Sequence, residues 1–558
     1  MKILVISLLR LGDIIQIAPI LAGLKKEDPK NEVHLLINSQ FSGLRKILPA
    51  VDKIHLFERD ILQTALGEAD RPVFEAFDRC RELIDSLQDQ GYDRIINLTH
   101  NRLSGWLTTL IGAKDISGLS YTSGGSPLFG GSWFRYLNSQ MSVRGGEPFH
   151  YADALYFATG LSEKRHPIVL RETESGIDAA EQKLRGLNSF IAIQPFTSDP
   201  KKNWPLKKYL ETIRTVAQLN PSLQFVILGS PAEGTKLHQF VQELRHGGLK
   251  ALGLFENLET TLSIVKRARL LLTGDTSIKH LAAATDTQIV ELSLGSRDYR
   301  KTGAYKPGSV ILQPHEECAP CPHSSPCSRS SHACAETLSS ELVSLVIDKL
   351  TAGRPNELRL LAREFEDEAE IVTTALSESG YWTFHSVLPR DGEKSIARLL
   401  DLSSWKMFLQ PDPQAAVGEF GTEGLRVRRS LKAAYPETSQ EEWLDQVHSL
   451  ENELERFESR LDIFLVDFKA YLKKFDQSQL FEQLCERLKG YFEKTPPGHV
   501  VSSYQREILG VLGDLSQIQD SDFLKIRKLN DGLLQAHQRL GVELRLLKSF
   551  KTGLMENA

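Results

Sequence analysis

The chain has 558 residues, of which 41% are hydrophobic and 25% are charged, and its formal net charge is −5. This length predicts about three to four domains with sizeable cores, and the charge argues against a protein that binds nucleic acid through bulk positive charge. The longest apolar runs fall short of the roughly 18 residues of a membrane span, and the apolar start is broken by Arg10 and Asp13. We therefore expect a cytoplasmic protein that begins with a buried strand.

Residues 1–165 alternate strand signals with helix signals. We predict strands at residues 3–8, 33–37, 54–57 and 94–98, with helices at 14–24, 41–48 and 74–90. Such alternation indicates βαβ units and a parallel sheet. Residues 118–148 are rich in glycine and aromatic residues, so we expect a long functional loop there.

A second block of the same kind covers residues 166–350. Strands are predicted at 191–194, 225–228, 270–273 and 289–292, and helices at 207–219, 278–284 and 336–350. Two doubly wound blocks in one chain place a crevice between them, at the carboxyl ends of their strands. We therefore predict an α/β fold with two Rossmann-like domains facing a central crevice.

The pattern over residues 351–558 is helical only. From Trp443 to Phe475 hydrophobic residues recur every three or four positions, and Thr438 with Glu441 fits a capping box before them. Such a stripe is typical of a helix in a bundle or of a coiled coil between subunits, and glycine and proline on both flanks favour the bundle. We predict an all-α C-terminal domain of unknown role.

Three segments that follow predicted strands carry polar side chains to the expected crevice. In the first, Gly12 allows a tight turn and Asp13 follows it, as either a helix N-cap or a general base that takes a proton from a hydroxyl. In the second, the hydroxyls of Thr197 and Ser198 and the ammonium of Lys202 suit a phosphate, and a solvated turn is the alternative.

The third segment runs from Thr273 to His280 and again joins a strand to a helix. Free backbone N–H groups and the side chains of Asp275 and Thr276 are expected to point into the crevice. His280 lies one turn into the helix, where it either reaches the same ligand or is a hydrogen-bonded packing histidine.

Four motifs in this order resemble glycosyltransferase family 9, the ADP-heptose heptosyltransferases of lipopolysaccharide synthesis. They are Arg10-Leu11-Gly12-Asp13, Lys202-Asn203-Trp204-Pro205, Gly229-Ser230-Pro231-Ala232-Glu233, and Asp275-Thr276 with His280-Leu281-Ala282-Ala283-Ala284. The resemblance covers residues 1–350. It implies the GT-B fold, with an N-terminal acceptor domain and a nucleotide-sugar donor domain, and an inverting transfer of a heptose or similar sugar that requires no cofactor.

Carried onto this chain, the resemblance implies that Asp13 is the general base. It also implies that seven further side chains contact the donor together with Ser277: Thr197, Ser198 and Lys202 at the phosphates, Glu233 at the nucleoside, Asp275 at the sugar hydroxyls, and Thr276 and His280 nearby. Two departures put the exact donor in question. The family has glycine where this chain has Ser277, and a Gly-Pro-Thr turn where it has Leu294-Gly295-Ser296.

Four cysteines, Cys318, Cys321, Cys327 and Cys334, lie in one short segment. Thiols clustered in a reducing compartment suit tetrahedral zinc or iron, which we expect to be structural, and four reduced thiols in a surface loop are the alternative. The resemblance adds that some members of the family have a similar cluster and that a group glycosylating autotransporters carries cysteine-bound iron.

The implied partners are a nucleotide-sugar donor and a glycan, lipid-linked or protein acceptor, and not nucleic acid. Peripheral contact with the cytoplasmic face of the inner membrane and an oligomer formed through the helical domain are further expectations. Two other functions stay open: a nucleotide-sugar 2-epimerase, which shares the two-domain fold, and a non-catalytic relative that acts as a binding platform through its helical domain. The joint presence of Asp13, Lys202 and Asp275 favours an enzyme.

Overall fold

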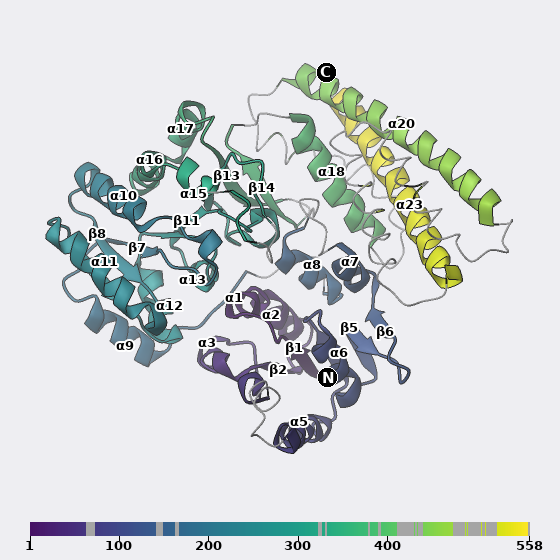
Figure 1. Cartoon of the computed structure of the whole chain (residues 1–558), viewed down its shortest axis with the longest axis horizontal. Coiled ribbons are helices and arrows are strands. Elements are labelled where there is room, and N and C mark those ends of the chain that lie inside the picture. Colours follow the sequence, from purple (N-terminus) through teal and green to yellow (C-terminus); the bar gives the residue numbers. More distant parts are fainter. Residues whose placement is uncertain are drawn as a thin grey trace. The chain divides into compact units, whose positions relative to one another are not determined.

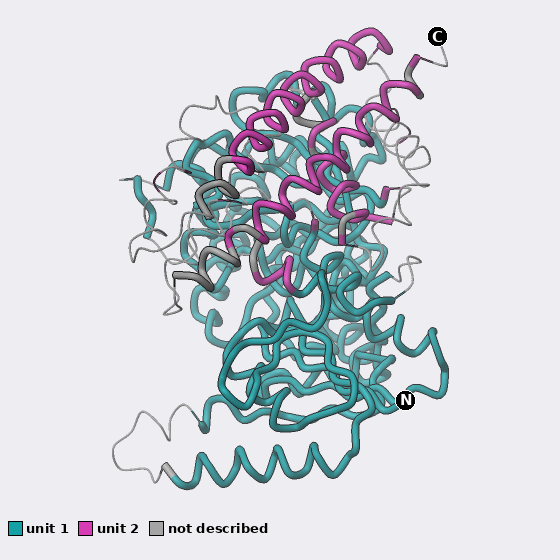
Figure 2. The backbone as a smooth tube through the Cα atoms, turned by 90° about the vertical axis from the view of Figure 1, so that its right-hand side faces the viewer, with its two compact units in different colours: residues 1–134, 150–376, 382–388 teal, residues 135–149, 377–381, 389–558 magenta. Residues whose placement is uncertain are grey.

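The computed structural model describes residues 1–62, 73–140, 149–161, 167–321, 326–329, 332–377, 380–388, 392–409, 439–472 and 522–555, and the single residues 429, 432, 486, 488, 504 and 508. The chain divides into two compact units (Figure 2). Unit 1 contains residues 1–134, 150–376 and 382–388, and unit 2 contains residues 135–149, 377–381 and 389–558.

The first sheet of unit 1 has six strands in the order β3-β2-β1-β4-β5-β6 (Figure 1). They are β1 (Lys2–Ile6), β2 (Glu32–Asn38), β3 (Lys53–Phe57), β4 (Arg94–Asn97), β5 (Asp115–Tyr121) and β6 (Pro127–Gly130). All neighbours are parallel except β5 and β6. The four strands predicted up to residue 98 are therefore confirmed, with ends shifted by one or two residues.

The helix predicted at 74–90 is confirmed, and the helices predicted at 14–24 and 41–48 are each divided in two. The helices around this sheet are α1 (Leu11–Gln16), α2 (Ala18–Glu27), η1 (Ser39–Phe41), α3 (Leu44–Ile47), α5 (Val73–Gln88), α6 (Arg102–Ile111), α7 (Ser132–Gln140) and α8 (Tyr151–Ala158). The single helix predicted at 14–24 is two helices that meet at Ile17, because Pro19 lies at the start of α2, where a missing N–H costs nothing.

The long loop predicted at residues 118–148 is wrong for its described part, residues 118–140. This segment contains most of β5, β6 and α7. Its glycines are instead needed for the pairing of β5 with β6. Gly118 has a positive φ, and a Cβ on Gly130 would lie 2.4 Å from the Ile116 carbonyl oxygen. Its aromatic residues serve packing, since Phe134 and Tyr136 are buried.

The second sheet of unit 1 has eight strands in the order β14-β13-β12-β11-β10-β7-β8-β9. They are β7 (Phe190–Gln194), β8 (Gln224–Leu228), β9 (Ala251–Leu254), β10 (Leu270–Thr273), β11 (Gln288–Leu292), β12 (Val310–Pro314), β13 (Ala369–Leu376) and β14 (Trp382–Ser386). The strands from β9 to β12 in this order are parallel, and β13 is antiparallel to both of its neighbours.

Helical structure alone was expected from residue 351, and this is wrong for residues 369–386. β13 pairs with β12 and β14 pairs with β13, so the sheet extends past the predicted end of the second domain. The physical reason is the residue content of β13, where Ile371, Val372, Thr373 and Thr374 form a β-branched run that favours extended backbone.

Helices cover both faces of the second sheet (Figure 1). They are α9 (Glu174–Lys183), η2 (Pro200–Lys202), α10 (Leu206–Leu219), η3 (Pro231–Glu233), α11 (Gly234–His246), α12 (Leu258–Arg267), α13 (Ser277–Ala282), α14 (Tyr299–Thr302), α15 (Ala333–Thr337), α16 (Ser340–Thr351), η4 (Pro355–Glu357) and α17 (Leu358–Glu364). Alternate residues of β7 enter two separate cores: Ile191 and Ile193 pack with α10, α11 and α16, whereas Phe190 and Ala192 pack with α9 and α12. Burial on both faces explains why these strands are continuous apolar runs.

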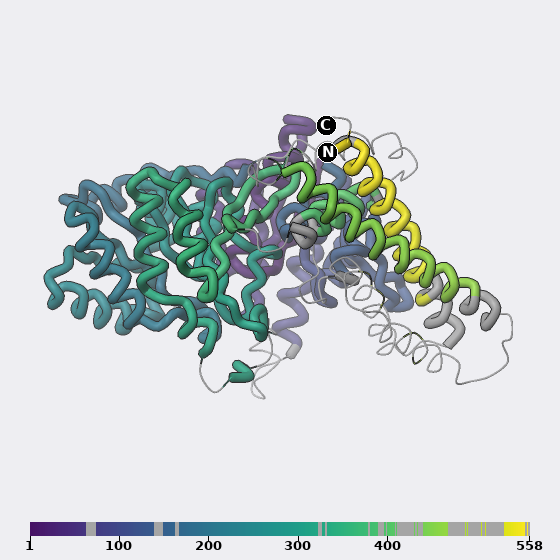
Figure 3. Tube along the Cα trace, turned by 90° about the horizontal axis from the view of Figure 1, so that it is seen from above, coloured from purple at the N-terminus to yellow at the C-terminus, as the bar shows by residue number. Residues whose placement is uncertain are grey.

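Unit 2 contains the helices α18 (Gly392–Phe408), α20 (Gln440–Leu472) and α23 (Asp522–Met555). Figure 3 shows α20 and α23 running side by side. The predicted stripe of α20 is buried from Trp443 to Leu461 in one core with α18 and α23, which is the packing expected of a bundle. Thr438 and Phe475 lie outside the described residues, and the capping box at this helix start joins Ser439 to Glu442, whose Oε2 accepts the Ser439 N–H at 2.7 Å. Among the described residues, none of the helices is both long and apolar enough to cross a membrane.

A group of charged side chains is enclosed in the core of unit 2. Arg539 donates to Asp401 and also lies against the rings of Trp405 and Tyr504, at 4.3 and 3.9 Å from their centres. Tyr504 donates to Glu543, one turn from Arg539. Burial, with Asp401 adding to it, raises the pKa of Glu543 to about 8. Glu543 is therefore protonated at neutral pH.

This burial makes the stability of unit 2 depend on pH through Glu543. The carboxyl is protonated more readily in the folded chain than in the unfolded chain, so its stabilising contribution is complete below pH 4.5 and is lost as the pH rises through 8. We expect the free energy of unfolding of wild type, relative to Glu543→Gln, to fall by about 1.4 kcal/mol per pH unit across this window. Urea unfolding followed by tryptophan fluorescence measures it, and Glu455→Gln, which removes an exposed carboxylate of α20, is the control. An equal pH dependence in wild type and Glu543→Gln contradicts the prediction.

Candidate functional site

Four loops meet at the carboxyl ends of β7, β8, β10 and β11. Glycines allow two of them to approach closely. A Cβ on Gly274, after β10, would lie 3.3 Å from Thr197 Cγ2, and a Cβ on Gly295, after β11, would lie 2.1 Å from the Lys201 carbonyl oxygen. Gly295 also has a φ of +64°, which residues with a side chain rarely adopt. Both this backbone conformation and the close contact therefore exclude a side chain at this position. The loops after β7, β10 and β11 are therefore in contact with one another.

Asp275 is the centre of this contact. Its Oδ2 accepts from Lys202 Nζ at 2.8 Å, and its Oδ1 lies 3.0 Å from Lys279 Nζ and 3.2 Å from Arg297 Nη1. Burial opposes ionisation of this carboxyl, but the three cations, with Arg297 the strongest, hold the pKa of Asp275 well below its usual value. The predicted pair Lys202 and Asp275 is thus brought into direct contact, and because Lys202 is buried, the solvated-turn alternative is wrong.

Sequence reasoning missed two charged side chains beneath Asp275. Lys279 Nζ donates to Glu291 Oε1 at 2.7 Å and to the Thr302 carbonyl oxygen at 3.0 Å, and both charged side chains are fully enclosed. Glu291 Oε2 also accepts the Ala304 N–H at 2.8 Å. Two signals were available: Asp275 and Lys279 are four residues apart in a helix start, and Glu291 is a charge inside an otherwise apolar strand.

A third missed residue is Arg297, in the loop after β11. Its Nε lies 3.3 Å from Glu291 Oε1 and its Nη1 lies 3.2 Å from Asp275 Oδ1, so one guanidinium joins the two carboxylates. The side chain is 5% exposed. Within the described part of the chain, its Nη2 has no hydrogen-bond partner.

Asp13 lies in the first turn of α1, at the carboxyl end of β1. The N-cap interpretation is wrong by three residues, because Arg10 is the N-cap and its N–H donates to Asp13 Oδ2 at 3.3 Å. Burial raises the pKa of the Asp13 carboxyl, the Asp275 charge adds to this, and Arg10 and Arg297 oppose it. Asp13 therefore lies within electrostatic reach of the Asp275 cluster and holds a proton more readily than an exposed aspartate.

Helix α1 packs against α13 beside this cluster. A Cβ on Gly12 would lie 2.7 Å from His280 Cδ2 and 3.6 Å from Ser277 Cα, so only glycine fits this approach. The Gln16 amide nitrogen donates to His280 Nε2 at 3.4 Å, while His280 Nδ1 has no partner among the described residues. Burial, aided by the Lys279 charge, lowers the pKa of His280 well below its usual value, so the imidazole is neutral.

The remaining predicted donor residues lie in the loops after β7, β8 and β10 and at the start of α13. Thr197 donates its hydroxyl to the Asp199 carbonyl oxygen at 2.7 Å, and Ser198 is exposed. The Thr276 hydroxyl lies 2.9 Å from that of Thr273, and Ser277 is the first residue of α13. Glu233 Oε2 accepts the N–H and the hydroxyl of Ser230, at 2.7 and 2.8 Å, which leaves Oε1 for another partner.

The cysteine segment lies against the loop after β11. Cys321 donates its N–H to the Gly295 carbonyl oxygen at 3.0 Å, and the Gly295 N–H donates to Cys334 Sγ at 3.4 Å. Burial raises the pKa of the Cys334 thiol, and the other three cysteines raise it further, so the four sulfurs are within electrostatic reach. However, no three His, Cys, Asp or Glu side chains of the described residues are gathered closely enough to hold a metal ion. The metal site stays a prediction.

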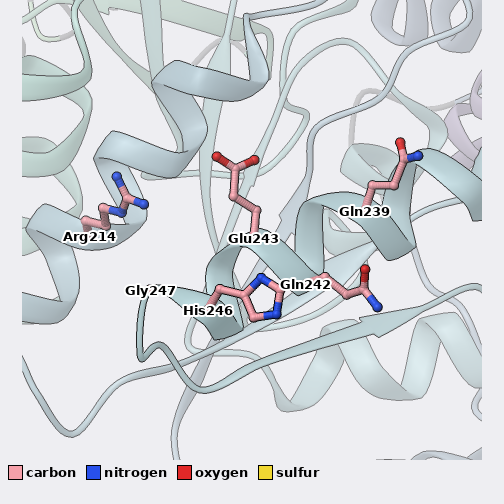
Figure 4. A pocket seen from close by; sticks show the side chains of 6 residues that line it. All are labelled: Arg214, Gln239, Gln242, Glu243, His246 and Gly247. Carbon is pink, nitrogen blue, oxygen red and sulfur yellow. The ribbon is translucent and has the colours of Figure 1, made fainter.

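A surface pocket of about 440 Å³ lies away from this site. Figure 4 shows Arg214 on one side and Gln239, Gln242, Glu243 and His246 on the other, with Gly247 completing the lining. Arg214 belongs to α10 and the others lie toward the C-terminal end of α11, opposite the end that begins beside Glu233. The pocket therefore has no part in the chemistry at the strand ends.

Comparison with known proteins agrees with this geometry. Residues 80–330 match the sequence model of glycosyltransferase family 9 (heptosyltransferase). The chain is 23% identical over 330 residues to lipopolysaccharide heptosyltransferase 1 of Pseudomonas aeruginosa, which covers 58% of this chain and 86% of that protein.

Among solved structures, a member of family 9 shows the same fold. A glycosyl transferase family 9 structure from Veillonella parvula has a TM-score of 0.51 at 17% identity, over 63% of this chain and 97% of that chain. The ADP-heptose lps heptosyltransferase II of E. coli has a TM-score of 0.47 at 17% identity, over 63% of this chain and 99% of that chain. The predicted GT-B fold is confirmed, and the predicted resemblance to family 9 is confirmed over residues 80–330 of this glycosyltransferase, which also has a helical C-terminal region.

Proposed function

We propose that this glycosyltransferase transfers a heptose from ADP-heptose to an acceptor hydroxyl of the lipopolysaccharide core, with inversion at the anomeric carbon. One observation carries the proposal: Lys202 and Asp275, on different loops at the carboxyl edge of the second sheet, form an ion pair within electrostatic reach of Asp13. The similarity to a lipopolysaccharide heptosyltransferase supports the choice of donor and acceptor.

Asp13 is the general base of the proposed reaction. Its carboxylate takes the proton of the acceptor hydroxyl while the acceptor oxygen forms a bond to the anomeric carbon. The bond from that carbon to the diphosphate oxygen breaks, and its electron pair leaves with ADP. The raised pKa of Asp13 supports this role, because a base that holds its proton more firmly is better matched to neutral pH.

The loops after β7 and β10 bind the donor in this proposal. Lys202 with the hydroxyls of Thr197 and Ser198 stabilises charge that develops on the diphosphate. Asp275 accepts hydrogen bonds from the sugar hydroxyls, with Thr276, Ser277 and His280 beside it. Glu233 holds the nucleoside through its second carboxylate oxygen.

The two domains divide the substrates. Residues 1–165 form the acceptor domain, and residues 166–350 form the donor domain, to whose sheet β13 and β14 are added. Within the acceptor domain Trp106 stacks on Tyr121, with ring centres 4.8 Å apart and planes 8° apart. This flat aromatic pair borders the β5–β6 hairpin and suits the face of an acceptor sugar. A lipid-linked acceptor also places the protein at the inner membrane.

Donor use tests the proposal directly. The full chain is incubated with ADP-heptose, UDP-sugars or GDP-sugars, each with and without lipid A–core oligosaccharide, and thermal protection and nucleoside diphosphate release are measured. We expect ADP-heptose alone to protect the fold and to release ADP only when the acceptor is present. Conversion of a UDP-sugar without acceptor indicates an epimerase, and absence of protection by any nucleotide sugar overturns the proposal in favour of a binding platform.

We also propose that the four cysteines bind one structural zinc or iron ion. Their spacing and their contacts with Gly295 support this, because a metal there holds the loop that carries Arg297 against the cysteine segment. Purified protein is expected to contain about one metal ion per chain by elemental analysis. Cys318→Ser with Cys321→Ser is expected to remove it, and Cys80→Ser is expected to retain it. Metal-free wild type contradicts the proposal.

A further inference from the structure

The cluster around Asp275 joins three cations to buried carboxylates. Lys202, Lys279 and Arg297 are the cations, Asp275 and Glu291 are the carboxylates that they contact, and Asp13 is within electrostatic reach. His280 adds no charge, because its pKa lies well below the usual value. A buried cation with an unused donor is costly, so such a donor at the edge of a binding site indicates an anionic ligand.

The unused donor is on one arm of Arg297. Its Nε and Nη1 are used by the two carboxylates, whereas Nη2 is enclosed and finds no acceptor in the described part of the chain. A guanidinium held by two of its nitrogens has a fixed direction, so the third nitrogen is already oriented for a ligand. An unmet donor on a charged group is also destabilising until a ligand supplies the acceptor.

We infer that Arg297 binds the diphosphate of the donor, as a second cation beside Lys202, and stabilises the nucleoside diphosphate as it leaves. The inference rests on the proposed function and adds to it a residue outside the motifs that carry the family resemblance. Both Lys202 and Arg297 contact the carboxylate of Asp275, from its two different oxygens. The two cations therefore lie on two sides of the Asp275 carboxylate, close enough together for one diphosphate to contact both.

The enclosure of Nη2 implies that donor binding moves a neighbouring element. Helix α1 contacts α13 through Gln16 and His280, and Asp13 of α1 is within electrostatic reach of Arg297. A diphosphate oxygen that reaches Nη2 accepts a charge-assisted hydrogen bond in an enclosed place, where such a bond is strong.

Binding of ADP compared with adenosine tests the inference, because only ADP carries the diphosphate. Both affinities are measured by calorimetry on the full chain for wild type, Arg297→Lys, Arg297→Gln and Arg300→Gln. Arg300 is the matched control: it lies in α14, three residues along, over the ring of Tyr299 at 4.8 Å. Arg297→Lys keeps the charge among the buried carboxylates and guards against a variant that fails to fold.

We expect Arg297→Gln to weaken ADP binding by about 10- to 100-fold and Arg297→Lys by about 3- to 10-fold. Adenosine affinity is expected to change by less than about twofold in both, and Arg300→Gln to change neither affinity. Equal weakening of ADP and adenosine, or an unchanged ratio between them, overturns the role of Arg297 while leaving the proposed function standing. If wild type itself binds ADP no better than adenosine, the proposed function and the inference both fail.

Discussion

Replacing Asp13 with asparagine is expected to lower kcat/KM for sugar transfer by about 10²–10⁴-fold while leaving donor binding unchanged. The amide cannot take the acceptor proton, and it removes no contact that the fold needs. Its side-chain oxygen still accepts the Arg10 N–H, which is the hydrogen bond that Asp13 makes at the start of α1. The measurement is ADP release under limiting acceptor, together with the KM for ADP-heptose.

The pH dependence of the wild-type reaction carries a second signature of Asp13. Its pKa is raised by burial, and only the ionised carboxylate is a base, so kcat/KM should fall as the pH drops through that raised pKa. Asp28→Asn, an exposed carboxylate of the same domain, is the matched control and should keep wild-type kinetics. Asp13→Asn with activity within about threefold of wild type removes Asp13 from the proton transfer.

Eight of the fourteen strands that the structure describes, four in each sheet, could be predicted because they leave short apolar runs in the sequence. β9 was missed for a local reason. It has four residues, and Gly253 interrupts it because a Cβ there would lie 2.9 Å from Val241 Cγ2 of α11. β13 and β14 were missed because the surrounding region was taken as helical, although the β-branched run from Ile371 to Thr374 was visible.

The site residues that could be predicted are likewise those that the local sequence marks, and the missed ones depend on contacts between distant segments. Asp13, Lys202 and Asp275 could be predicted because each follows a strand end, and the carboxyl ends of parallel strands meet at one edge of a sheet. Glu291 and Arg297 could not, because their importance depends on meeting Asp275 and Lys279 across separate loops. A charge inside an apolar strand signals a buried partner, but it does not identify that partner.

Replacing Glu291 with glutamine is expected to lower the free energy of unfolding of unit 1 by about 3–5 kcal/mol, the usual cost of removing one partner of a buried ion pair. Glu291 is fully enclosed and accepts from Lys279, from Arg297 and from the Ala304 N–H. Without its charge, two buried cations depend on Asp275 alone. Urea unfolding of the full chain, followed by fluorescence and compared with wild type, measures the loss, and Glu341→Gln on the exposed side of α16 is the control.

The double variant Glu291→Gln with Lys279→Met separates pairing from packing. Removing both partners leaves no uncompensated charge between them, so the double variant should be less destabilised than the sum of the two single variants, by about 1–3 kcal/mol. Strict additivity would mean that Glu291 and Lys279 contribute independently, and a loss below about 1 kcal/mol in Glu291→Gln would mean that water replaces the carboxylate. Because Asp275 belongs to the same cluster, the variants that lose stability should also bind ADP more weakly. In the proposed function, the charges that hold the loops together are also the charges that bind the donor.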